Sequence, residues 1–183
     1  MKCYCILCLS ICFILFGCGN NNQQQAQAAQ SQVVVTSTAG LDLQALGEIV
    51  KTSHDAAEIE QRVNVRGGVN NLDLNNDGNV DYIFVNEYDS NGTRGFSFVV
   101  DNNGTKQEVA DIQVASSGTN ATLIIIGNRN IYGDGCYYNN NYLLADLLIW
   151  NYMWRPHQYY VSPYHYGYYP RYYRRYRTRP YIP

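Results

Sequence analysis

Apolar side chains recur at helical spacing between residues 41 and 64. They fall every three or four positions in two short runs, one on each side of Thr52-Ser53-His54 (Leu43, Leu46, Ile49 and Val50, then Ala56, Ile59 and Val63). Asp55 followed by Glu58 is typical of an N-terminal capping arrangement that starts the second run. The pattern predicts a helical hairpin over residues 41–64 with its apolar side turned inward.

The pattern then changes to the alternation and β-branched or aromatic content of strands. Four such runs cover residues 80–88, 95–100, 108–115 and 121–126, and Gly- or Asn-containing turns separate them. Short connections of this kind predict an antiparallel β-meander. Because a small sheet needs a cover for its apolar face, the helical hairpin is expected to pack on it, which makes the fold class α+β.

A further short helix is predicted over residues 142–154, ahead of Pro156. The segment is apolar nearly all round, and Asp146 is its only charged residue. Three interpretations stay open: the helix packs on the sheet, lies in a membrane interface, or forms a partner-binding surface. It is too short to span a bilayer.

Charge divides the chain into two unlike parts. Residues 19–146 carry 6 Lys/Arg and 15 Asp/Glu, whereas residues 147–183 carry 6 Arg and no acid, together with eleven of the 18 Tyr. Residues 156–183 are a low-complexity tail in which Pro and Gly forbid a long helix. The tail is expected to be a disordered or extended terminus.

The tail also allows a second interpretation, as a polyanion-binding arm. Arg offers bidentate contacts to phosphate and Tyr offers stacking faces. The candidate contacts are Arg171, Arg174, Arg175, Arg177 and Arg179. On an exported protein the available polyanions are lipopolysaccharide phosphates, anionic lipid head groups, acidic glycans and extracellular DNA. Export argues against nucleic acid as the main partner.

The N-terminus has the pattern of an export signal. Lys2 is followed by an apolar stretch from Ile6 to Phe16, which ends in Leu15-Phe16-Gly17-Cys18. These four residues resemble the lipobox of bacterial lipoproteins. The resemblance implies cleavage after residue 17, lipidation of Cys18, and, through Gly19, anchoring at the outer membrane of the cell envelope. The alternative is an ordinary secretory signal or an uncleaved anchor.

Domain boundaries follow from this reading. Residues 1–17 are a signal peptide, residues 18–38 an Asn/Gln/Ala-rich flexible tether, residues 39–155 the folded domain and residues 156–183 the tail. Four of the six cysteines lie in the signal peptide and Cys18 carries the lipid. Cys136 is then alone, and the mature domain forms no internal disulfide.

Acid and amide side chains alternate in the segment that follows the helical hairpin. Asp73, Asn75, Asp77, Asn79 and Asp81 occupy loop positions 1, 3, 5, 7 and 9, and Gly78 occupies position 6. In a tightly wound loop the side chains at positions 1, 3 and 5 converge, the Asn79 carbonyl adds a backbone oxygen, and Asp81 binds directly or through water. Hard oxygen ligands of this kind favour calcium. Position 12 is Phe84, so a further acid would have to come from Glu87, Asp89 or Asp101. The alternative is an Asx-rich turn that needs no metal.

Loop and lipobox together resemble uncharacterised bacterial lipoproteins with an EF-hand-like calcium loop. The resemblance implies a non-enzymatic binding or structural module of the envelope. The first alternative is an envelope hydrolase acting on glycan or phosphodiester, for which Glu87 and Asp89 are the only candidate carboxylates, both expected on a solvated strand face. The second is a polyanion-binding adhesin that acts through the tail.

Overall fold

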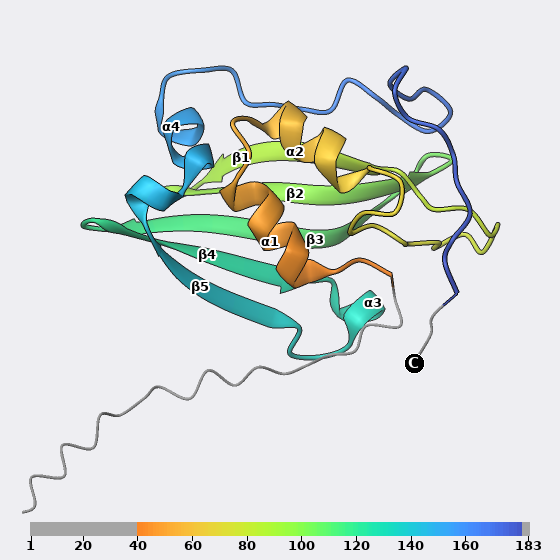
Figure 1. Cartoon of the computed structure of the whole chain (residues 1–183), viewed down its shortest axis with the longest axis horizontal. Helices are drawn as coiled ribbons and strands as arrows, with labels where there is room; N and C mark the ends of the chain where they lie inside the picture. Colours follow the sequence, from red (N-terminus) through yellow and green to blue (C-terminus); the bar gives the residue numbers. More distant parts are fainter. Residues whose placement is uncertain (1–39, 181–183) are drawn as a thin grey trace, which may run out of the picture. The chain divides into compact units, whose positions relative to one another are not determined.

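The computed structural model describes residues 40–180, and the predicted signal peptide, lipidation site and tether lie outside them. The α+β fold class is confirmed (Figure 1). The elements are α1 (Leu43–Lys51), α2 (Ala56–Val63), β1 (Ile83–Ser90), β2 (Thr93–Asn102), β3 (Thr105–Ser117), β4 (Asn120–Gly127), α3 (Arg129–Tyr132), β5 (Tyr137–Leu143), a 3₁₀ turn (Leu144–Asp146) and α4 (Leu148–Trp154).

The helical hairpin is present, and side chains cap both of its helices. Asp42 accepts from the Ala45 amide at the start of α1, and Asp55 accepts from the Glu58 amide at the start of α2. Glu58 also reaches back, to the amide of His54. These caps explain why two helices of only nine and eight residues begin where the sequence predicts.

The sheet is an antiparallel meander with the strand order β1-β2-β3-β4-β5. The first two hairpins turn at Asn91-Gly92 and Asn103-Gly104, where all four residues have positive φ. Turns of this kind match the twist of the flanking strands. α1 and α2 lie across one face of the sheet (Figure 1).

The main core lies between these helices and the sheet. Alternate strand residues supply the sheet side of this core. They include Ile83, Phe96, Phe98, Ile112, Leu123 and Ile125, all of them fully buried. Gly47 permits close approach of α1, because a Cβ there would lie 2.5 Å from Cδ1 of Ile125. α4 closes the core at one end with Ile149 and Met153. This packing agrees with the first of the three interpretations of the last helix.

The boundary of that last helix was predicted wrongly. Residues 137–143 form a fifth strand, β5, and the α-helix begins only at Leu148. Tyr138, Asn140 and Tyr142 alternate with exposed neighbours and pair with β4. Within residues 40–180 no helix has the length and apolar character needed to cross a membrane.

The tail was expected to be disordered or extended, and through residue 180 it is extended and packed on the domain. It crosses the fold from α4 and returns beside the segment that precedes β1 (Figure 1). Tyr173 and Tyr176 are buried with Val80, Tyr82 and Phe84 in a second apolar cluster. The tyrosine rings supply the apolar surface that a disordered segment lacks, and this explains the difference.

The tail also closes the outer edge of β1. The Glu87 amide donates to the Tyr160 carbonyl at 2.7 Å, and the Ser162 amide donates to the Val85 carbonyl at 3.1 Å. Asn64 exchanges two further hydrogen bonds with the backbone of Ile83. Free edge groups invite pairing with another chain, and here polar groups of the same chain satisfy them.

Candidate metal-binding loop

The segment Asp73–Asp81 is a tightly wound loop that leads into β1. Asn76 and Gly78 have φ of 58° and 77°, and these two left-handed residues reverse the chain twice within three positions. Asp73 holds the far side of the loop, because its two carboxylate oxygens accept from the amides of Asp77 (3.0 Å) and Gly78 (2.9 Å). The local spacing of polar residues thus produces the predicted winding.

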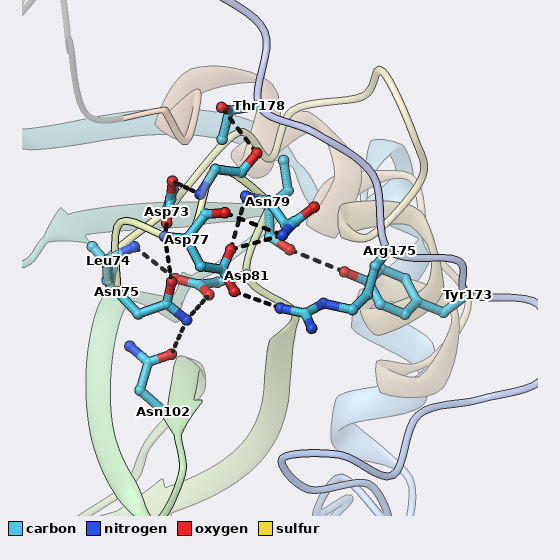
Figure 2. Close-up of polar contacts among 12 residues, drawn as sticks. Asp73, Leu74, Asn75, Asp77, Asn79, Asp81, Asn102, Tyr173, Arg175 and Thr178 are labelled. Carbon is cyan, nitrogen blue, oxygen red and sulfur yellow. Dashed lines mark hydrogen bonds and ion pairs between the residues drawn. The ribbon is translucent and has the colours of Figure 1, made fainter.

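Side-chain oxygens gather on one side of this loop (Figure 2). The Asp77 amide donates to Oδ1 of both Asp73 and Asn75, so these two oxygens lie close together. Asp81 turns back across the loop, where it accepts from the Leu74 amide at 2.6 Å and from the Asn75 side chain at 3.3 Å. The structure therefore brings predicted positions 1, 3 and 9 toward one another.

Asp77 makes an ion pair that the loop sequence does not reveal. Nη2 of Arg175 lies 2.6 Å from its Oδ2, and the Asn79 amide donates to its Oδ1 at 2.8 Å. The Asn79 hydrogen bonds and the Arg175 guanidinium hold the pKa of Asp77 below its ordinary value. The tail thus supplies a positive charge to the loop.

Asp81 has the opposite electrostatic environment. It is 8% exposed, and burial, together with the charges of Asp73 and Asp77, raises the pKa of this carboxyl above its ordinary value. The Leu74 amide opposes that effect only in part. Three acids close in sequence therefore repel one another, and Arg175 is the one cation that the structure shows bonded to them within residues 40–180.

Within residues 40–180, no acid from outside the loop bonds to it. Asp101 accepts from the Gly104 amide in its own turn, and Asp89 pairs with Arg94. Asn102 is the residue that does reach the loop, since its side-chain oxygen accepts from Asn75 at 3.4 Å. Among the described residues, no three His, Cys, Asp or Glu side chains lie together as a ready metal cluster. Any metal ligand set would therefore draw on the amides and backbone oxygens as well.

The tail holds the loop through its backbone too. The Val80 amide donates to the Tyr176 carbonyl at 2.9 Å, and the Thr178 amide donates to the Gly78 carbonyl at 3.1 Å. The Tyr173 hydroxyl donates to the Val80 carbonyl at 3.1 Å. Loop and tail are therefore one structural unit, although about a hundred residues separate them in sequence.

Glu60, in α2, binds the tail through its carboxylate. Its carboxylate is almost fully buried and accepts from four donors, namely the Tyr82, Tyr160 and Ser162 hydroxyls and the Val85 amide. Burial raises the pKa of this carboxyl despite those hydrogen bonds. Glu60 thus joins α2, the β1 edge and the tail at one point.

Glu87 was expected on a solvated strand face, and the structure corrects this. Its side chain has no exposed surface and lies 3.0 Å from Nε2 of His157, while the Tyr152 hydroxyl donates to it at 3.0 Å. Burial lowers the pKa of His157, but the Arg155 carbonyl and the Glu87 carboxylate outweigh it and raise the pKa above the ordinary value. No local pattern in the sequence marks this pair, because 70 residues separate its members.

The predicted polyanion contacts divide into two groups. Arg175 is engaged with Asp77, and Arg179 donates to the carbonyls of Gly67 and Gly68. Arg171, Arg174 and Arg177 are exposed and form no hydrogen bond or ion pair with any described residue. Cys136 is a buried free thiol whose pKa burial raises, which does not suit a nucleophile.

Comparison with known proteins adds no relative. No family model, no curated protein and no solved structure matches this chain.

Proposed function

We propose that this chain is a lipid-anchored protein of the cell envelope, a non-enzymatic binding or structural module that binds calcium at Asp73, Asn75, Asp77, Asn79 and Asp81. The gathering of the Asp73, Asn75 and Asp81 side chains in one wound loop carries the proposal. Burial and the charges of Asp73 and Asp77 raise the pKa of Asp81, and a cation there would relieve the part that comes from these charges. Oxygen ligands without His or Cys suit calcium.

Calcium in this loop would act as a brace. The loop leads into β1 and bonds to the tail, so fixing it fixes the entry to the sheet and the tail together. Because position 12 lacks the bidentate acid, we expect an affinity of about 10⁻⁴–10⁻³ M, the range of extracellular calcium modules. Binding of that strength would add about 1–3 kcal/mol of stability at about 10 mM calcium.

Thermal melting of the full chain in detergent, with calcium, with magnesium and with neither, tests the proposal. We expect calcium to raise the melting temperature of the wild type, and Asp73→Asn and Asp81→Asn to lose that increase. Asp134→Asn is the matched control, because Asp134 is an exposed acid that pairs with Arg129 outside the loop. If millimolar calcium did not raise the melting temperature of the wild type, the calcium site would be refuted.

The anchor has a separate test. In bacterial cells fed a labelled fatty acid, the wild-type chain should take up the label, and Cys18→Ser should not. Cys136→Ser is the control, since Cys136 is a buried thiol of the domain. Label on the Cys18→Ser chain would contradict lipidation at that residue.

A second candidate function, polyanion binding, is favoured by one observation. Arg171, Arg174 and Arg177 are exposed without partners among the described residues, and the exposed rings of Tyr168 and Tyr172 lie in the same segment. Arg beside aromatic rings suits lipopolysaccharide phosphates and anionic head groups. We expect salt-sensitive binding to lipopolysaccharide that Arg171→Gln/Arg174→Gln/Arg177→Gln abolishes. Unchanged binding by the triple variant would reject this candidate.

A further inference from the structure

The two edge strands of the sheet differ in whether their outer backbone groups have hydrogen-bond partners. Asn64, Glu60 and the tail satisfy the outer edge of β1. β5 is the other edge, at the end of the sheet farthest from β1 (Figure 1). Nothing among residues 40–180 bonds to the outer backbone groups of β5. An edge of this kind is a template for a further strand.

The register shows which backbone groups of β5 are free. The Gly127 amide donates to the Cys136 carbonyl, and the Leu144 amide donates to the Thr119 carbonyl. Even-numbered residues of this strand therefore turn their backbone groups toward β4. Because the groups alternate along an antiparallel strand, the residues that turn theirs outward are Tyr137, Asn139, Asn141 and Leu143, and their side chains are also exposed.

The β5 edge lacks the features that normally protect such a strand. Edge strands usually carry charges, Pro or bulges that block pairing. Residues 135–145 contain no Asp, Glu, Lys, Arg or Pro, and the pairing of β5 with β4 runs without a shift. Tyr137 and Leu143, at the two ends of the strand, are 49% and 56% exposed.

We propose that β5 pairs antiparallel with β5 of a second copy of this chain, so that the two sheets join across a twofold axis through Asn140. The strand is self-complementary in this register. Asn139 lies opposite Asn141 of the other copy, and Tyr137 lies opposite Leu143, so each outward residue meets an outward residue. These pairs exchange all the free amides and carbonyls of the edge. No charge faces another charge.

A second copy fits this edge better than an unrelated strand does. Self-pairing sets uncharged side chains against uncharged side chains along the whole edge, because residues 135–145 contain no Asp, Glu, Lys or Arg. Tyr137 beside Leu143 covers the exposed rings and methyl groups at both ends of the strand, and Tyr138 lies opposite Tyr142 on the helix side. An isologous contact of this kind closes on itself as a dimer.

Sedimentation equilibrium of the full chain in detergent tests the dimer with two charge-altered pairs of variants. Asn139→Lys/Asn141→Lys and Asn139→Asp/Asn141→Asp each set like charges opposite one another in both central pairs. Each double variant alone should dimerise about tenfold more weakly or worse. An equal mixture of the two should dimerise again, because Lys then faces Asp.

The matched control is Asn130→Lys/Asn151→Lys, which adds the same charge at two exposed Asn residues away from β5. It should dimerise like the wild type. Circular dichroism melting of every variant shows whether the domain has kept its fold. The proposal is overturned by a wild-type chain that stays monomeric at its highest soluble concentration, by a folded Lys double variant that still dimerises fully, or by a mixture that stays monomeric.

Discussion

The domain contains two apolar clusters that are built in different ways. The main core is largely aliphatic and comes from periodic helix and strand positions. The second cluster consists of Val80, Tyr82, Phe84, Tyr173 and Tyr176, and two of its five residues come from the low-complexity tail. The comparison shows that an irregular Tyr-rich segment can be part of a fold when its rings find an apolar surface and its hydroxyls find acceptors.

Hydroxyl partners are what separate the second cluster from a simple aromatic patch. Tyr173 donates to the Val80 carbonyl, and Tyr82 donates to the buried carboxylate of Glu60 at 2.8 Å. The Tyr82 and Tyr173 rings meet edge to face with centroids 4.8 Å apart, which is a favourable aromatic geometry. Because the hydroxyl of each of its three tyrosines needs a polar partner, we expect the second cluster to be easier to disrupt locally than the main core.

Phe98→Ala should have the largest effect, because it removes a fully buried ring from the main core. We expect a loss of about 3–5 kcal/mol in the free energy of unfolding, with the whole domain affected. Chemical denaturation measures it. Tyr168→Ala, at a ring 57% exposed in the tail, is the control and should change little. A loss below 1 kcal/mol at Phe98 would contradict the view that the main core stabilises the whole domain.

Tyr173→Ala should release the tail and leave the sheet intact. The ring is 8% exposed, and its burial contributes about 1.5–3 kcal/mol, but the loss is limited to the free energy that docks the tail. Trypsin should then cleave quickly after Arg171 and Arg174, while amide exchange in β3 stays slow. Equal loosening of β3 and the tail would show that the two clusters unfold as one.

Glu60→Gln tests the hydrogen bonds that the buried Glu60 carboxylate makes to the tail and to the second cluster. The amide cannot accept all the donors that meet the carboxylate, so we expect about 1–3 kcal/mol of destabilisation. Burial raises the pKa of Glu60, so the folded state binds its proton more tightly than the unfolded state does. This contribution is fully present below the ordinary pKa of 4.5 and is lost as pH rises through the raised value.

The advantage of the wild type over Glu60→Gln should therefore be larger near pH 4 than at pH 7. Denaturation curves of both proteins across this range measure it. An advantage that grows with pH would mean that the folded state prefers the ionised carboxylate. Glu58→Gln, on the same helix but only partly buried, is the matched control for an acid whose pKa lies below its ordinary value.

Local patterns predicted the parts of the fold whose causes are local. The helix caps at Asp55 and the turns at Asn91-Gly92 follow from neighbours in sequence, and so does the winding of the Asp73–Asp81 loop. β5 was missed because Asn139-Asn140-Asn141 carries no hydrophobic alternation, and only pairing with β4 makes it a strand. The docking of the tail was missed because its partners lie about a hundred residues away in sequence, and the tail has no regular spacing of apolar residues that would indicate packing.

In the candidate site, too, the local features were predicted from the sequence and the distant partners were not. The alternation of Asp and Asn predicted which oxygens gather, whereas Arg175 and Asn102 could not be found from loop spacing. The oxygen-rich loop sequence predicted a calcium ion from outside. The described structure adds an internal cation in the form of Arg175, which bears directly on how tightly calcium would bind.

Arg175→Gln should have the smallest effect on stability and the most informative effect on the loop. The Arg175–Asp77 pair is 51% and 36% exposed, so its loss should cost less than about 1 kcal/mol without calcium. The variant frees the Asp77 carboxylate from a competing cation, so calcium affinity measured by calorimetry should rise. Arg174→Gln removes the same charge from a neighbour that has no partner among the described residues and should change affinity far less. If Arg175→Gln bound calcium no better than Arg174→Gln, Asp77 would serve the tail as an ion-pair partner and would not be a metal ligand.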